Sequence, residues 1–318
     1  MSTITGLHHV TVISGDAQEN YDFYSGVLGM RLVKRSVNQD DPGTYHLFYA
    51  DAEGHAGNDV TFFPWGNRPA GRRGAGLTNE LALAVSPGSL AYWAERLSRH
   101  GVATAEPTMR FGEPALTFTD PHGLALALVE TADPRDSTPW ADSPVPEARQ
   151  IRGLHAVRIV ERDMGPTVRF LAEGLGFRKL AEEDGWHRYA LEGGGSGRVL
   201  DVQELPDAPR GTWGVGSVHH VAWRVPDDVT ERTVRERVRS AGARPTDVID
   251  RFWFKSVYFK EPGGALFEIA TDGPGFAIDE SPTALGERLI LPPWLEPHRA
   301  EIEHALPALT THRVEARA

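Results

Sequence analysis

The sequence contains no cysteine among its 318 residues. This absence excludes disulfide bonds, cysteine-ligated zinc, iron–sulfur clusters and thiol nucleophiles, so any metal must be held by His, Asp or Glu. The chain also has no run of basic residues, and its formal net charge is -11. A negatively charged protein of this kind is poorly suited to nucleic acid or to an anionic membrane as its main partner.

Long apolar runs are missing as well. No stretch is long enough to span a bilayer as a helix, and residues 1–8 lack the basic and apolar regions of a signal peptide. We therefore expect a cytoplasmic protein with no membrane partner. The composition, 40% hydrophobic and 24% charged, is typical of a globular chain whose length allows two domains.

What the chain does contain is an internal repeat. Residues 154–160 match residues 7–13, and the match continues through a helical pattern to a glycine stop, Gly29 in the first copy and Gly176 in the second. A second unit lies between these copies, and it recurs at the end of the chain. Each unit reads as a strand, a helix and further strands that close in a hairpin, so the chain order is module 1, module 2 and their copies, modules 3 and 4.

This repeat predicts an α+β fold of four βαβββ modules whose curved mixed sheets form barrel-like cups. We expect an N-terminal domain at residues 1–132 and a C-terminal domain at residues 151–275. The Pro- and charge-rich residues 133–150 are expected to link them. Apolar residues in the segment 276–318 predict a tail that docks onto the body.

Comparison of the modules selects three candidate metal ligands. Module 1 has His9 on its first strand and module 4 has His220 on its first strand. The last strand of module 4 carries Glu268 in an apolar run. The counterpart of His9 in module 3 is Ala156, and the counterpart of Glu268 in module 2 is Ala127. A lone His on a strand is more often structural, but Glu is rarely buried without a partner. Two His and one carboxylate form the facial triad with which non-haem Fe(II) keeps positions open for O₂ and substrate, although Zn²⁺, Mn²⁺ or Ni²⁺ could also occupy it. Such a triad requires modules 1 and 4 to pair in space, with modules 2 and 3 as an empty counterpart.

Other histidines are weaker candidates. His8 and His219 precede the two ligands and point to the opposite face of an ideal strand. Two roles stay open for them: hydrogen bonding within the sheet, or reaching the pocket where the strand twists. We expect His46 to lie in a turn or at a module end, exposed to solvent.

Five segments carry a more specific signal: residues 6–11, 216–222, 250–259, 267–276 and 291–296. Through them the chain resembles, along essentially its whole length, the vicinal oxygen chelate superfamily of glyoxalases, bleomycin resistance proteins and extradiol dioxygenases. More narrowly, it resembles the ring-cleaving hydroquinone dioxygenases of that superfamily. The resemblance implies Fe(II) at His9, His220 and Glu268, and catalytic or substrate-facing roles for His8, Thr11, His219, Arg251 and Tyr258. A guanidinium and a phenol suit this chemistry because they stabilise negative charge on ring oxygens.

The expected function is therefore an Fe(II)-dependent ring-cleaving dioxygenase that acts on a hydroquinone-type aromatic and O₂. Mn(II) or another divalent ion is the alternative metal. The protein could also form a homo-oligomer. A catechol extradiol dioxygenase is one alternative, but such enzymes usually take their first His from module 3, where Ala156 stands. A glyoxalase-like isomerase or lyase generally needs a fourth ligand, and Thr61 or Phe62 supplies no carboxylate there. A non-catalytic small-molecule binding protein would lack the triad.

Overall fold

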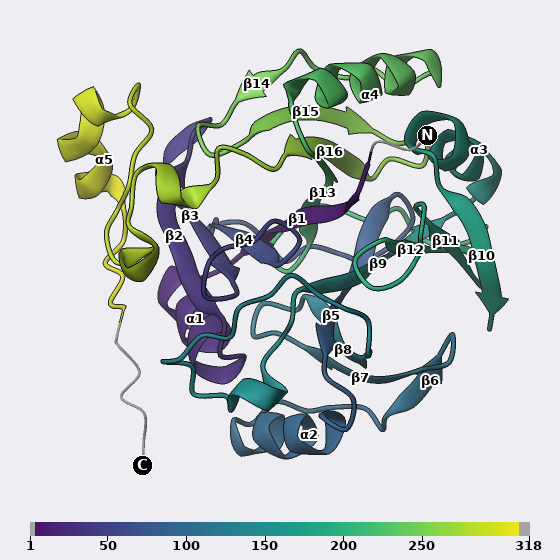
Figure 1. Cartoon of the computed structure of the whole chain (residues 1–318), viewed down its shortest axis with the longest axis horizontal. Coiled ribbons are helices and arrows are strands. Elements are labelled where there is room, and N and C mark those ends of the chain that lie inside the picture. The colour runs from purple at the N-terminus through teal and green to yellow at the C-terminus, as the bar shows by residue number, and fades with distance from the viewer. Residues whose placement is uncertain (1–3, 312–318) are drawn as a thin grey trace.

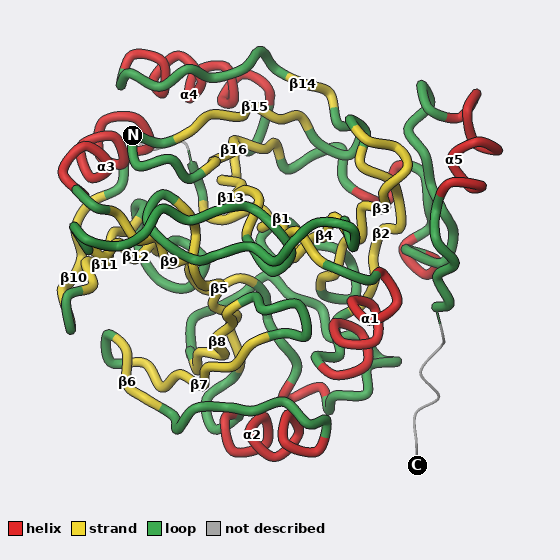
Figure 2. The backbone as a smooth tube through the Cα atoms, turned by 180° about the vertical axis from the view of Figure 1, so that it is seen from behind, coloured by secondary structure: helices red, strands yellow, loops and turns green. Residues whose placement is uncertain are grey.

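The computed structural model describes residues 4–311, which form two eight-stranded sheets. The strands of the first sheet are β1 (Gly6–Ser14), β2 (Arg31–Asn38), β3 (Asp41–Ala50), β4 (Asp59–Pro64), β13 (Val218–Val225), β14 (Ile249–Asp250), β15 (Lys255–Lys260) and β16 (Leu266–Thr271). Those of the second are β5 (Leu77–Val85), β6 (Thr108–Arg110), β7 (Glu113–Thr119), β8 (Ala125–Glu130), β9 (Leu154–Glu161), β10 (Arg178–Glu183), β11 (Trp186–Ala190) and β12 (Val199–Glu204). Both sheets curve, and the helices lie around their outside (Figures 1 and 2).

Each sheet joins one module from each half of the chain. The first runs in the order β14-β15-β16-β13-β1-β4-β3-β2 and therefore pairs modules 4 and 1, while the second, β10-β11-β12-β9-β5-β8-β7-β6, pairs modules 3 and 2. The central contacts β1–β13 and β5–β9 are antiparallel, whereas β1–β4 and β13–β16 are parallel. The mixed α+β fold and the pairing of modules 1 and 4 are thus confirmed. The domain boundaries stay a prediction, because both sheets draw on both halves.

The helices begin and end where local chemistry indicates. They are α1 (Ala17–Tyr21), α2 (Leu90–Arg99), α3 (Met164–Phe170), α4 (Asp228–Ser240) and α5 (Arg299–Ala305), with π-helical turns at Asp22–Val27 and Leu171–Leu175 and 3-10 turns at Glu147–Arg149, Phe276–Ile278, Pro282–Ala284 and Glu296–His298. Asp16 caps α1 by accepting a 2.9 Å hydrogen bond from the Glu19 amide, and Asp163 caps α3 at the equivalent position. Gly29 and Gly176 follow the two π-helical turns with φ of 71° and 83°, a conformation that glycine adopts without strain.

The C-terminal segment packs against the first sheet. Leu291 and Ile302 are buried against Val37 of β2, and α5 lies beside β2 and β3 at the edge of the molecule (Figure 1). The fully buried Lys34 donates to the carbonyl of Phe276 at 3.1 Å and also pairs with two acidic residues of the segment. Residues 312–318 of the expected tail lie outside the described residues. Among residues 4–311, no helix is both long and apolar enough to cross a membrane.

Candidate metal centre

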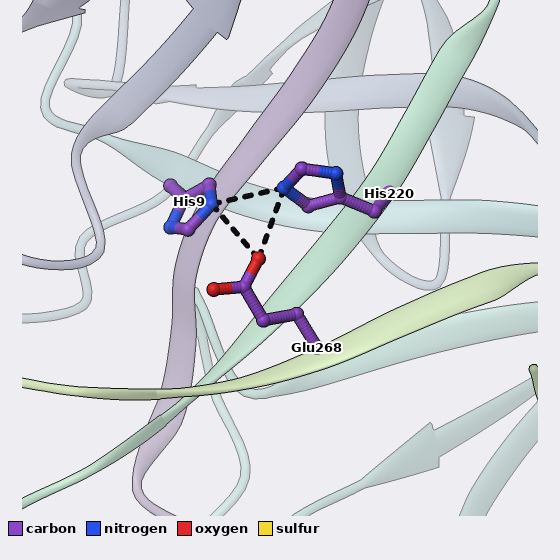
Figure 3. A group of neighbouring side chains, drawn as sticks. All are labelled: His9, His220 and Glu268. Atoms are coloured by element: carbon purple, nitrogen blue, oxygen red, sulfur yellow. Dashed lines mark hydrogen bonds and ion pairs between the residues drawn. The ribbon is translucent and has the colours of Figure 1, made fainter. Parts of the chain in front are cut away.

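Three side chains of metal-ligand type converge from three adjacent strands. His9 lies on β1, His220 on β13 and Glu268 on β16, and all three are buried. The two Nε2 atoms are 3.2 Å apart, and Glu268 Oε2 lies 3.3 Å from Nε2 of His9 and 3.0 Å from Nε2 of His220 (Figure 3). Oε2 accepts no hydrogen bond of regular geometry, whereas Oε1 accepts one of 2.5 Å from Ser256 Oγ. Two ring nitrogens and an orphaned carboxylate oxygen that face one point fit a divalent metal ion.

The His pairs lie at β-bulges of the β1–β13 ladder. The register slips between Leu7 and His9, so His8 is the extra residue on β1, and a second slip makes His219 the extra residue on β13. In a regular strand neighbouring side chains point to opposite faces, but a bulge redirects the extra side chain. Each extra histidine therefore lies beside the candidate ligand that follows it, and not on the opposite face of the sheet as in a regular strand.

The extra histidines orient the candidate ligands His9 and His220 by hydrogen bonding. His8 Nε2 lies 3.1 Å from the carbonyl of Thr271, and His8 Nδ1 lies 2.9 Å from His9 Nδ1. Because a carbonyl only accepts, a neutral His8 carries its proton on Nε2 and accepts at Nδ1 from His9, which leaves the lone pair of His9 Nε2 for the site. His219 Nδ1 lies 2.8 Å from His220 Nδ1 in the same arrangement, so that His219 is left with an Nε2–H donor.

Burial, more than the neighbouring charges, favours this protonation pattern. Burial, and then the neighbouring His9, lowers the pKa of His8 to about 3, and burial with His220 does the same for His219. Burial opposes ionisation of Glu268, but His9 and His220 outweigh it and hold the pKa of this carboxyl well below its ordinary value. The two orienting rings are therefore neutral and the carboxylate is ionised, as metal binding requires.

A cavity of about 630 Å³ opens beside the three ligands, within the size range of small-molecule sites. His219, Arg251 and Tyr258 line it together with two of the candidate ligands, His9 and His220. The guanidinium of Arg251 pairs with Asp40 at 2.8 and 3.2 Å and lies 5.5 Å from the centre of the Tyr258 ring. Burial raises the pKa of Tyr258 above its ordinary value, so its phenol stays protonated. Three of the five residues expected to be catalytic are thus brought to the cavity wall.

The other two lie behind the wall. His8 contacts His9 as described, and Thr11 is fully buried with its Oγ1 2.7 Å from Thr61 Oγ1. Thr61 lies on β4 opposite Thr11, in the same way that Glu268 lies on β16 opposite Ala222. The position that could supply a fourth ligand therefore carries a hydroxyl.

The prediction that His46 is exposed in a turn is wrong. His46 lies within β3, lines the same cavity, and packs its ring 3.8 Å from that of Phe48 and 4.5 Å from that of Phe63. Burial, followed by the nearby His9 and His220, lowers the pKa of His46 well below its ordinary value. The signal was the alternation from Tyr45 to Tyr49, which places His46 and Phe48 on one face and the buried Tyr45, Leu47 and Tyr49 on the other.

The equivalent positions of the second sheet hold ion pairs instead of a ligand set. Ala156 and Ala127 replace His9 and Glu268, as the module comparison predicted, and both pair with Ala82. Glu80 replaces His220 and binds Arg110 at 2.6 Å, while the buried Asp201 accepts from Arg188 at 2.8 and 3.1 Å. Within residues 4–311, His9, His220 and Glu268 are the one group close enough to share a metal ion.

The duplicated βαβββ fold and, among the described residues, one His–His–Glu cluster beside a cavity define the class of this protein as a two-sheet fold with a candidate metal centre. Residues 6–128 and 153–269 match the family model of the Glyoxalase/Bleomycin resistance protein/Dioxygenase superfamily, and the chain belongs to this superfamily. The resemblance seen in the sequence motifs is thereby confirmed.

Its relatives include proteins named as ring-cleaving dioxygenases. The chain is 41% identical over 301 residues to "Putative ring-cleaving dioxygenase MhqO" of Bacillus subtilis, with 95% of each chain covered. It is 33% identical over 307 residues to chlorohydroquinone/hydroquinone 1,2-dioxygenase of Sphingobium indicum, covering 94% of this chain and 95% of the relative. A crystal structure from Bacillus subtilis superposes with a TM-score of 0.93 at 39% identity, covering 98% and 99% of the two chains. The chain is thus an enzyme of the ring-cleaving dioxygenase group.

Proposed function

We propose that this protein is an Fe(II)-dependent dioxygenase that opens a hydroquinone-type ring between a hydroxylated carbon and its neighbour. The observation that carries the proposal is the convergence of His9, His220 and Glu268 on one point, with His9 and His220 at the wall of the cavity. Such a triad leaves coordination positions open on the cavity side. The relative named chlorohydroquinone/hydroquinone 1,2-dioxygenase supports the substrate class. The same donor set would also accept Mn(II).

His9, His220 and Glu268 would hold Fe(II), and the metal would supply the redox chemistry that couples oxidation of the ring to reduction of O₂. The residues of the chain orient the reactants and carry the charge. Arg251 and Tyr258 place a cation and a phenol donor at the cavity wall, where they stabilise a phenolate and the negative charge that develops on oxygen.

His219 contributes a proton donor at a fixed position. Its Nδ1 is engaged by His220, and its ring stacks on Trp213 at 4.8 Å with an interplanar angle of 26°. The remaining Nε2–H belongs to a ring that lines the cavity. His8 acts through His9, whose tautomer it sets, and Thr11 acts through its hydrogen bond to Thr61.

Two features count against the alternatives. Thr61 stands where a four-ligand isomerase would need a carboxylate, and its hydroxyl is already hydrogen-bonded to Thr11. The ligand set is built from modules 1 and 4, whereas Ala156 occupies the module 3 position that a catechol extradiol enzyme would use. Both observations support the hydroquinone assignment.

The test is O₂ uptake by Fe(II)-reconstituted protein supplied with hydroquinone, catechol or the methylglyoxal–glutathione adduct. We expect uptake with hydroquinone. We also expect Glu268→Gln to abolish it and Glu80→Gln, which alters an acid of the second sheet, to retain it. The absence of uptake with every dihydroxybenzene would refute the proposed function.

A further inference from the structure

His46 lines the cavity and has one ring nitrogen to which no role has been assigned. Its Nε2 lies 2.9 Å from Thr61 Oγ1, which in turn lies 2.7 Å from Thr11 Oγ1. These contacts, with Phe48 and Phe63 packed against the ring, hold the imidazole in one orientation. Among residues 4–311 no hydrogen-bond partner contacts the other nitrogen, Nδ1, of this cavity-lining side chain. A polar atom held in place without a protein partner is suited to bind a ligand group.

The position of His46 in the sheet sets its separation from the candidate metal centre. β3 is separated from β1 by one strand, β4. Two strand spacings place the backbone of His46 roughly 9–10 Å from that of β1. A ligand with polar groups at two opposite ends suits a cavity whose wall carries His9 on one strand and His46 two strands away.

This spacing separates the classes of dihydroxybenzene. In a 1,4-dihydroxybenzene the two hydroxyls lie at opposite ends of the ring, so that one can approach the metal centre while the other points across the cavity. In catechol the hydroxyls are adjacent, and both lie at the same end. The 1,4 isomer can therefore direct one hydroxyl toward the metal centre and the other toward a side chain two strands away, whereas catechol directs both to one end.

We propose that His46 is a specificity-determining residue whose Nδ1 hydrogen-bonds the hydroxyl para to the one at the metal centre. This inference rests on the proposed hydroquinone substrate and names the side chain that recognises it. A neutral imidazole serves either hydrogen-bonding role, since its Thr61 contact decides whether Nδ1 donates or accepts. The apolar rings of Phe48 and Phe63 pack against His46 and lower the local dielectric, which increases the contribution of such a bond.

The test is equilibrium binding without O₂, which does not depend on turnover. The affinities of hydroquinone and phenol for the Zn(II)-loaded protein are compared by calorimetry, because the two ligands differ by the para hydroxyl alone. We expect hydroquinone to bind about tenfold or more tightly, a ratio that corresponds to about 1.4 kcal/mol. In His46→Phe, which keeps an aromatic ring between Phe48 and Phe63, the ratio should fall to the statistical factor of about two for two equivalent hydroxyls.

Two further variants identify the nitrogen. The amide of Asn lies near the position of Nδ1 and that of Gln near Nε2, so His46→Asn should retain part of the ratio and His46→Gln should lose it. The exposed His100→Phe is the matched control and should bind both ligands as the wild type does. These variants also keep the test decisive if His46→Phe fails to fold.

A ratio near two in the wild type, or a tenfold ratio that survives in His46→Phe and His46→Gln, would overturn the inference. The outcomes separate it from the proposed function. If the enzyme takes up O₂ with hydroquinone but the ratio of hydroquinone to phenol affinity is unchanged in the variants, only the role of His46 is refuted. Lack of O₂ uptake combined with loss of the ratio in His46→Phe would refute the dioxygenase reaction and keep the recognition of the para hydroxyl.

Discussion

Replacement of His8 by Phe tests whether the bulged histidines control the metal centre. The change leaves the buried Nδ1–H of His9 without its acceptor at 2.9 Å and the carbonyl of Thr271 without its donor at 3.1 Å. Loss of a hydrogen-bond partner that orients a metal-ligating His typically reduces metal affinity 10–100-fold, which corresponds to about 1.4–2.7 kcal/mol. Each unsatisfied buried group should also destabilise the folded state by about 1–3 kcal/mol.

The assay is competition for Fe(II), and separately for Zn(II), against a chromophoric chelator, combined with urea unfolding of the metal-free protein. His155→Phe is the matched control. His155 is the module 3 counterpart of His8, is equally buried, lies on β9 of the sheet that has no ligand set, and hydrogen-bonds Ser196. The control variant should lose stability but bind metal as the wild type does. His8→Asn, which keeps an acceptor near Nδ1, should recover part of the affinity. Wild-type metal affinity in His8→Phe, or an equal loss in His155→Phe, would refute the reasoning.

Two further predictions concern stability away from the site. Arg188→Met should lower the free energy of unfolding by about 1–3 kcal/mol, because the fully buried Asp201 loses its bidentate partner and keeps only the 3.2 Å hydrogen bond from Arg158. Urea titration measures this change, and unchanged metal affinity would confirm that the effect belongs to the second sheet. Burial, followed by the neighbouring Glu261, raises the pKa of Glu161 from 4.5 to about 8. The unfolded chain therefore binds fewer protons between these pH values, and stability should fall as pH rises from 4.5 to 8. Glu161→Gln should flatten this dependence in urea titrations across the window, and a wild-type slope in the variant would contradict the assignment.

Much of the fold followed from the repeat. The identities shared by residues 7–13 and 154–160, and the glycine stops at Gly29 and Gly176, are local features, and they reappear as equivalent strands and π-helical turns. The pairing of modules 1 and 4 also followed, because the candidate ligands were divided between them. For the tail, the sequence showed only a group of apolar residues. The burial of Lys34 beneath it could not be predicted from the sequence, because a lysine is rarely buried without partners, and here distant segments supply them.

The sequence by itself determined which residues are the candidate ligands, because a Glu in an apolar strand and a His at one copy of a repeat stand out without any coordinates. The tertiary structure decided where the neighbouring side chains point. His8 and His219 lie beside their ligands because the ladder slips by one residue at each pair, and a slip depends on the partner strand more than two hundred residues away. His46 reaches the cavity because β3 lies two strands from β1 in the same curved sheet. Strand pairing is a non-local property. The residues of the donor set can therefore be predicted from the sequence, but the arrangement of the groups around them cannot.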